Sequence, residues 1–172
     1  MGFYLTDVEL KRMIEKVIVS LHKIMPIRTE ADLRCAFVTG LTFLMHNKGA
    51  RFNGTPWSLV AEHYWHDCDA RLDLAIYDAD RVRFIIEFKH KARFGNSDLT
   101  ATGRDVTRLE AVLSNISWQV DFYQVLSAYT NSTEEIRARR ILKTFHDSIQ
   151  NFVTFHTCYV VLDKPLLLPS NP

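Results

Sequence analysis

The sequence RFIIEFKHKA, residues 83–92, joins a strand pattern to a pair of charged side chains. Residues 84–86 are apolar and aromatic or β-branched, which is typical of a strand inside a sheet. Glu87 and Lys89 follow with one residue between them. Because side chains alternate between the two faces of a strand, Glu87 and Lys89 share one face and Phe88 points to the other. An acid and a base at the end of an apolar strand predict a functional site there.

A second acidic residue lies on the preceding predicted strand. In ARLDLAIYD, residues 70–78, alternation places Asp73 on one face and its neighbours Leu72 and Leu74 on the other. A polar turn follows this stretch and is expected to join the two strands into a hairpin. That hairpin brings Asp73 and Glu87 close together on one face of the sheet.

Two neighbouring carboxylates favour a metal ion between them. Like charges a few ångström apart repel, so one carboxylate holds a proton unless a cation lies between them. Mg²⁺ binds carboxylate oxygens and completes its shell with water, and Mn²⁺ is expected to substitute for it. We therefore expect Asp73 and Glu87 to bind Mg²⁺, with Glu62 on the strand before them as a third ligand. Lys89 is then expected to position the attacking water and to offset charge on a phosphate.

The rest of the chain predicts helices around these strands. Helical spacing of apolar residues predicts a helix over 7–24, and Thr29 caps a second helix over 30–47. The predicted elements that follow are strands over 57–65, 71–77 and 81–89, helices over 104–130 and 134–149, and a strand over 152–162. Three consecutive strands form a meander, and the fourth joins through a helical crossover. The expected fold is therefore α/β, with a central mixed four-stranded sheet flanked by helices.

Size and cysteine content favour one domain without a disulfide framework or a structural zinc site. The chain has 172 residues, of which 47% are hydrophobic, enough for a sizeable core in a single domain over 1–172. Its three cysteines are scattered and form neither a disulfide framework nor a zinc ribbon. His63, His66 and Cys68 are close in sequence but lack a fourth ligand at metal-site spacing, which disfavours zinc.

Charge and hydropathy indicate the setting of the chain. The sequence shows no signal-peptide pattern and no apolar run of membrane-spanning length, so a cytoplasmic location without membrane contact is the simplest expectation. The formal net charge is only +1, which excludes an overtly basic nucleic-acid binder. Any surface that binds nucleic acid is therefore expected to be local.

The spacing of Asp73, Glu87 and Lys89 on consecutive strands resembles the PD-(D/E)xK nuclease superfamily. That superfamily has an αβββαβ core, the restriction-endonuclease-like fold, which is similar to the predicted order over residues 29–163, with the N-terminal helix added. The resemblance implies a metal-dependent nuclease that hydrolyses DNA in restriction, repair, recombination or phage defence. It implies that Asp73 and Glu87 bind the metal and that Lys89 assists the nucleophile. Leu72 stands where the superfamily often has proline.

The resemblance implies further residues around this site. It calls for an acid on the helix before the sheet or on the first strand, for which Glu30 and Glu62 are the candidates. Gln119 and Tyr123 have a Q-x-x-x-Y arrangement that resembles a motif of the recombination-exonuclease branch, where the glutamine lies beside the catalytic site. Gln119 is thus a candidate catalytic residue, and Tyr123 a candidate substrate contact.

Basic residues near the site are candidate contacts to the DNA backbone. Lys91 and Arg93 follow the E-x-K motif directly, where a phosphate would lie. A later cluster, Arg137, Arg139, Arg140 and Lys143, has the spacing of a solvated helix face as well as that of a phosphate contact. A homodimer, which would place one site on each strand of the DNA, or a larger complex is expected for a domain of this size.

Other interpretations fit part of the same pattern. Glu87 and Lys89 could be an ion pair at the end of an edge strand, and Asp73 could be satisfied by Arg71 or by a backbone amide. The chain would then be a catalytically inactive nuclease-fold module that binds nucleic acid or protein. A two-carboxylate glycosidase is a third alternative, but it leaves Lys89 without a role.

Overall fold

The computed structural model describes most of the helices and strands of the chain. The described residues are 7–47, 51–52, 55–66, 69–78, 81–91, 97, 104, 107–112, 114, 116, 118, 120–129, 133, 136–141, 143 and 153–163. Gln119 and Arg93, both predicted to lie at the site, fall outside them, as does Cys68.

Six strands form one mixed sheet in sequence order. They are β1 (Arg51–Phe52), β2 (Thr55–Trp65), β3 (Ala70–Asp78), β4 (Arg81–Lys91), β5 (Val120–Tyr129) and β6 (Val153–Leu162). Each of β1, β2 and β3 is antiparallel to the strand that follows it. β5 runs parallel to β4, and β6 runs parallel to β5. The parallel pairs require crossovers, and helical residues lie between β4 and β5 and between β5 and β6.

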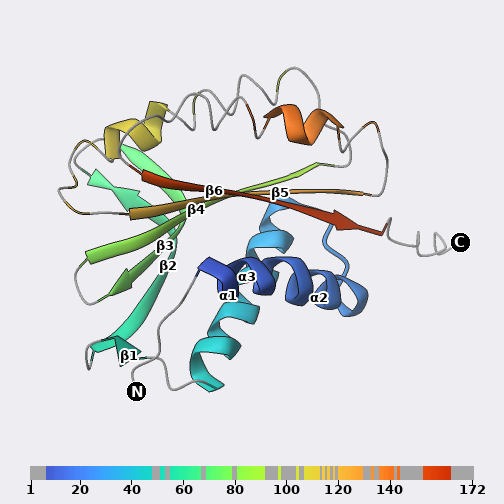
Figure 1. The fold of residues 1–172 in the computed structure, drawn as a ribbon, viewed down its shortest axis with the longest axis horizontal. Helices are drawn as coiled ribbons and strands as arrows, with labels where there is room; N and C mark the ends of the chain where they lie inside the picture. The colour runs from blue at the N-terminus through green and yellow to red at the C-terminus, as the bar shows by residue number, and fades with distance from the viewer. Residues whose placement is uncertain are drawn as a thin grey trace, which may run out of the picture.

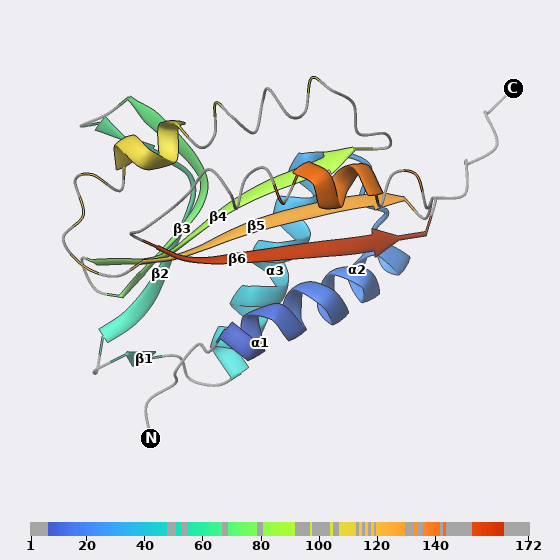
Figure 2. The ribbon, with the colours of Figure 1, turned by 45° about the horizontal axis from the view of Figure 1, so that its top comes forward.

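Helices cover both faces of this sheet. The N-terminal run consists of α1 (Asp7–Arg12), a π-helical turn η1 (Met13–Val17) and α2 (Ile18–Ile24), and it is followed by α3 (Glu30–Asn47). Figure 1 shows these helices on one face and two short helical segments, coloured yellow and orange, on the other. Figure 2 shows the same division after a turn of the molecule. The short segments contain residues 107–112 and 136–141.

The start of α3 is fixed by a reciprocal cap. The backbone N–H of Asp32 donates to Thr29 Oγ1 at 3.1 Å, and the backbone N–H of Thr29 donates to Asp32 Oδ2 at 2.9 Å. These two bonds satisfy amides that a helix N-terminus otherwise leaves without partners. The predicted cap at Thr29 is therefore confirmed, and it sets which residues of α3 face the sheet.

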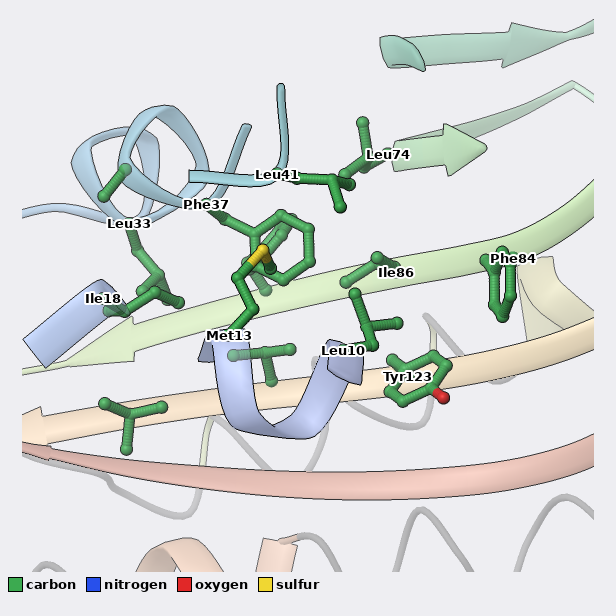
Figure 3. Close-up of a cluster of buried hydrophobic side chains, with 14 of the residues drawn as sticks. Leu10, Met13, Ile18, Leu33, Phe37, Leu41, Leu74, Phe84, Ile86 and Tyr123 are labelled. Carbon is green, nitrogen blue, oxygen red and sulfur yellow. The ribbon is translucent and has the colours of Figure 1, made fainter. Parts of the chain in front are cut away.

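The largest hydrophobic core lies between the N-terminal helices and the sheet. Phe37 and Leu41 of α3 point toward Ile86 of β4 in Figure 3. The rings of Phe37 and Phe88 meet edge to face with their centroids 5.0 Å apart, a favoured geometry for an aromatic pair. This packing holds α3 across β4, beside the part of the strand that carries Glu87.

The sheet differs from the predicted one at residues 120–129. They were predicted to continue a helix over 104–130, but they form β5, so the predicted helix is wrong there and the sheet has more than four strands. Seven consecutive residues, 122–128, are buried. A parallel strand covered on both faces is a continuous apolar run, and such a run also satisfies helical spacing. The coarser expectation, an α/β fold with a mixed sheet flanked by helices, is confirmed.

The predicted elements elsewhere agree where the structure describes them. The helix expected over 7–24 contains the π-helical turn η1 in its middle, and the helix expected over 134–149 is described as helical at 136–141. The last strand begins at Val153. None of the helices in the described part of the chain has both the length and the hydropathy needed to cross a bilayer.

Candidate active site

The strands β3 and β4 separate at Asp73 and Glu87. Their antiparallel register runs from the turn up to the pair Leu74–Ile86. One residue beyond it, the backbone N–H of Asp73 donates to Glu87 Oε1 at 3.2 Å, and the backbone N–H of Phe88 donates to Asp73 Oδ2 at 2.8 Å. Carboxylates thus accept the bonds that strand carbonyls would accept in a continuous ladder. We call this position the fork.

An irregularity of β2 lies opposite the fork, at Glu62. Glu62 has a φ of 51°, in the left-handed region that costs a residue with a side chain about 1 kcal/mol or more. The pairs Ala61–Leu74 and His63–Leu72 flank it, so Glu62 and Asp73 face each other outside the register. Such strain is retained where surrounding contacts hold it, and here those contacts involve the Glu62 carboxylate.

Strand alternation on β3 is interrupted at the same level of the sheet. Alternation predicted that Leu72 and Leu74 share a face, but Leu74 packs in the core beneath α3 whereas Leu72 packs in the core on the opposite face. That prediction is wrong because the irregularity at Glu62 and Asp73 interrupts the alternation. As a result, Asp73 comes within reach of α3.

Arg34 of α3 connects the two acids. Its Nη1 lies 3.5 Å from Asp73 Oδ1 and its Nη2 lies 2.5 Å from Glu62 Oε1. Arg71 of β3 forms an ion pair with the other oxygen of Glu62. Asp73 is therefore satisfied by Arg34 and by the Phe88 amide. Sequence patterns missed Arg34, although its position one residue after the buried Leu33 was a signal that it borders the sheet-facing side of α3.

Lys89 is also held by α3. Its Nζ lies 3.9 Å from Glu30 Oε2, and the Lys89 side chain is 18% exposed. Glu30 and Arg34 are one helical turn apart, so the same side of α3 supplies an acid to Lys89 and a base to Asp73. The structure thus brings Asp73, Glu87 and Glu62 together through Arg34 and a backbone amide, and it pairs Lys89 with Glu30 one helical turn before Arg34.

Glu87 is the most buried acid of this region. It is 6% exposed, and the parallel register places Gln124 of β5 directly beside it. Gln124 Nε2 donates to the backbone carbonyl of Glu87 at 3.4 Å. Gln124 Oε1 is buried without a hydrogen-bond partner among the described residues. Sequence patterns also missed this residue, although a single glutamine inside the buried run of β5 was a signal.

The remaining predicted residues have different surroundings. Lys91 is exposed at the end of β4, next to the fork. Tyr123 is fully buried in the core, and its ring lies against that of Phe84 with centroids 6.2 Å apart. It therefore lies inside the sheet and not on a helix surface, where the Q-x-x-x-Y arrangement had placed it. The exposed cluster on residues 136–141 includes Arg139, which lies over the ring of Tyr159 at 5.9 Å.

His63 of β2 has structural partners. The Tyr77 hydroxyl and His63 Nε2 are hydrogen-bonded at 2.8 Å, and the rings of His63 and Trp65 meet edge to face. Burial, with a smaller contribution from His66, lowers the pKa of His63 below its ordinary value. Each of these contacts favours a neutral, packed imidazole at this position.

The carboxylate oxygens at the fork are ligands of the kind that a hard cation could bind. Within the part of the chain that the structure describes, no three His, Cys, Asp or Glu side chains are grouped as a metal centre. Mg²⁺ is commonly held by only one or two carboxylates, with water and substrate phosphate as the other ligands. Asp73 and Glu87 provide such a pair, and the ammonium of Lys89 follows on the same strand.

Comparison with known proteins identifies no relative of this chain. A scan against protein-family models, a search of curated proteins and a search of solved structures each found no match. The function is therefore inferred from the residues of the fork and their contacts.

Proposed function

We propose that the chain is a divalent-metal-dependent nuclease that hydrolyses phosphodiester bonds of DNA at the fork. The observation that carries the proposal is that the Asp73 and Glu87 carboxylates each accept a backbone amide where β3 and β4 separate, with Lys89 two residues after Glu87 on β4. Two acids at a break in a ladder, one of them buried, are a place where a bound cation offsets the cost of burying charge. The E-x-K spacing adds a base of the kind that phosphoryl chemistry uses.

The topology supports a restriction-endonuclease-like core for the same chain. A helix, α3, precedes the antiparallel meander β2–β3–β4, and β5 then runs parallel to β4 after helical residues. This is the αβββαβ order, extended here by β1, β6 and the N-terminal helices. The fork lies in the centre of that core, between its second and third strands.

Asp73 and Glu87 are the residues that would hold the metal ion. Each carboxylate has one oxygen in a hydrogen bond to a backbone amide, which fixes its orientation across the fork. When bound, Mg²⁺ or Mn²⁺ would polarise a phosphate oxygen and lower the pKa of a water molecule. Glu62, on the facing strand β2, is the candidate for an additional ligand.

Lys89 is proposed to assist the hydrolysis itself. The oxygen of a water molecule bonds to phosphorus and gives up a proton, the bond to the leaving sugar oxygen breaks, and that oxygen takes up a proton. Negative charge develops on the phosphate during this exchange, and an ammonium beside it stabilises the charge in a site from which water is partly excluded. The 3.9 Å contact with Glu30 orients the Lys89 ammonium.

A local cluster of bases is proposed to bind the DNA backbone. Arg34, Arg71, Lys89 and Lys91 lie on α3, β3 and β4 around the fork. With a formal net charge of only +1, the molecule has no general attraction for nucleic acid, so binding depends on these few phosphate contacts. We expect DNA affinity to fall steeply as salt concentration rises.

One observation favours a second candidate function, a catalytically inactive module that binds nucleic acid or protein. Arg34 already pairs with Asp73 and Glu62, so the acids have a positive partner without any metal ion. In that case the fork is a structural ion-pair network. Metal binding and cleavage separate the two candidates directly.

The test is cleavage of plasmid and linear DNA with Mg²⁺ or Mn²⁺. We expect cleavage that EDTA abolishes and that the substitution Lys89→Ala reduces by about a hundredfold or more. Lys16→Ala, an exposed lysine on η1, is the matched control and should cleave like the unaltered protein. Absence of cleavage together with absence of divalent-ion binding by calorimetry would favour the inactive module.

A further inference from the structure

Arg34 occupies the position of a cation between two acids from different strands. Its guanidinium reaches Asp73 on β3 and Glu62 on β2, and its side chain is only 20% exposed. A guanidinium is always charged and presents several donors in one plane, so it can satisfy two carboxylates at once. In this arrangement the charge of Arg34 is directed at an acid that the proposed function assigns to a metal ion.

The partners of Arg34 have other contacts to keep them in place. Glu62 also pairs with Arg71, and Asp73 also accepts the amide of Phe88 at 2.8 Å. If the guanidinium moves away, each acid therefore retains a donor. A cation that binds Asp73 has to replace only the 3.5 Å contact to Arg34, which is the longer of the two contacts that Arg34 makes.

The contacts of Arg34 keep its charge from a phosphate until a metal ion binds. Arg34 pairs with the carboxylates of Asp73 and Glu62, so its donors are occupied by acids of the fork. A divalent ion at Asp73 would add two positive charges to this site, where Coulomb interactions are strengthened by partial burial.

We propose that Arg34 is a built-in competitor of the metal ion at Asp73, and that metal binding releases its guanidinium to bind a phosphate of the DNA. The inference rests on the proposed function, because it takes Asp73 as a metal ligand. Arg34 is well suited to the second role, since a guanidinium forms two parallel hydrogen bonds with a phosphate. The consequence is an order of binding: the metal ion binds first, and the nucleic acid follows.

Competition is measured first with the metal alone. Mg²⁺ and Mn²⁺ are titrated calorimetrically into the unaltered protein and into Arg34→Gln, which removes the charge. We expect the variant to bind the metal about tenfold more tightly, because the ion no longer displaces a guanidinium. Lys16→Gln is the control: it removes one positive charge from an exposed lysine of η1 that makes none of the contacts of the fork, and it should change metal affinity less than about twofold.

The release of Arg34 to DNA is measured by binding in the background of Lys89→Ala, which prevents cleavage. With saturating Mg²⁺, adding Arg34→Gln is expected to weaken binding of a short duplex about tenfold. With EDTA in place of Mg²⁺ it should have little effect, because the guanidinium is then held by the acids. An equal loss with and without the metal would overturn the switching role.

The outcomes distinguish this inference from the proposed function. Metal binding that Arg34→Gln tightens, in a protein that cleaves no DNA, supports the competition and contradicts the nuclease. Metal affinity that Arg34→Gln leaves unchanged or weakens overturns the competition even if cleavage is observed, as does a lack of metal binding by both proteins. If Arg34→Gln does not fold, Arg34→Lys serves instead: an ammonium cannot span both acids, so a smaller tightening of several-fold is expected.

Discussion

The carboxylate of Asp73 accepts a hydrogen bond from the backbone N–H of Phe88 at 2.8 Å, where a strand carbonyl would accept it in a continuous sheet. The reverse contact, from the Asp73 amide to the Glu87 carboxylate, makes the exchange mutual. The two acids therefore hold the fork open as well as facing the proposed metal. Structural and chemical roles of the same side chains can be separated by substitution.

The first prediction separates these roles at Asp73. Asp73→Asn keeps an oxygen that can accept the Phe88 amide but removes the charge, so we expect the free energy of unfolding to change by about 1 kcal/mol or less and cleavage to fall by more than about a hundredfold. Asp73→Ala removes the acceptor of the buried Phe88 amide, so it should lower the free energy of unfolding by about 1 to 3 kcal/mol in addition to reducing cleavage. Urea denaturation and DNA cleavage measure the two effects, and equal losses of stability would contradict the bonding role.

A second prediction concerns Gln124, which is 1% exposed beside Glu87. Its only described hydrogen bond is the long one at 3.4 Å to the Glu87 carbonyl, and its Oε1 has no partner among the described residues. Gln124→Leu is therefore expected to change the free energy of unfolding by about 1 kcal/mol or less. Gln124→Glu places a carboxylate in the same buried position next to an existing acid and should cost about 3 to 5 kcal/mol.

Urea denaturation at several pH values checks the Gln124 pair. The cost of Gln124→Glu should shrink at low pH, because protonation removes the buried charge, whereas the effect of Gln124→Leu should not depend on pH. A Gln124→Leu variant that loses several kcal/mol would show that the amide makes stronger contacts than the single long bond indicates.

Strand spacing was sufficient to predict that Asp73 and Glu87 lie near each other. The reason is local: Glu87 and Lys89 lie on one strand, Asp73 lies on its hairpin partner, and a hairpin brings neighbouring segments together. The structure places the Asp73 and Glu87 side chains across the fork, each bonded to a backbone amide. Alternation could not predict the irregularity at Glu62, because it breaks the period of two at a residue whose carboxylate contacts Arg34 and Arg71.

Features that depend on distant segments were missed. Arg34 meets Asp73 across 39 residues of sequence, and no local pattern encodes that contact. β5 was predicted as helix because its run of buried residues satisfies helical and strand spacing alike, and only the neighbours β4 and β6 select the strand. Gln124 was missed for the same reason, since its place beside Glu87 follows from the register of β5.

The third prediction is that the fold loses stability in mild acid. His90 of β4 is buried, its Nδ1 is hydrogen-bonded to Ser127 Oγ at 2.7 Å, and its ring packs against that of Tyr129. Burial is the main cause that lowers the pKa of His90 below its ordinary value of 6.5, with smaller contributions from His22 and Lys91 and an opposing one from Asp32. Burial is also the main cause that lowers the pKa of His63.

The sign follows from proton binding. Near and below pH 6.5 the unfolded chain binds protons that the folded chain does not, so the stabilisation is complete above the unfolded pKa and is lost as pH falls through the lowered folded pKa. Urea denaturation between pH 5 and 8 should show this decline, and His90→Asn should make it shallower. His46→Gln, at an exposed histidine of α3, is the control and should leave the slope unchanged.

The last prediction concerns the close crossing of α3 and η1 at Gly40. A Cβ at this position would lie 2.7 Å from Val17 Cγ1, closer than carbon atoms pack. Alanine usually stabilises a helix interior by about 1 kcal/mol relative to glycine. Overpacking of a tight contact costs about 1 to 3 kcal/mol, and because Val17 is β-branched and stiff it cannot move aside easily. Gly40→Ala is therefore expected to destabilise the protein.

A double-mutant cycle identifies the cause. Gly40→Ala should be less harmful, or even favourable, in a Val17→Ala background, because the shorter side chain leaves room for the new methyl group. The neighbouring Thr39 is exposed, so comparing Thr39→Ala with Thr39→Gly gives the helix propensity of α3 without the contact. If Gly40→Ala raises the free energy of unfolding as much as that comparison predicts, α3 and η1 pack less closely than the structure shows, and the orientation of α3 that brings Arg34 to the fork would have to be revised with it.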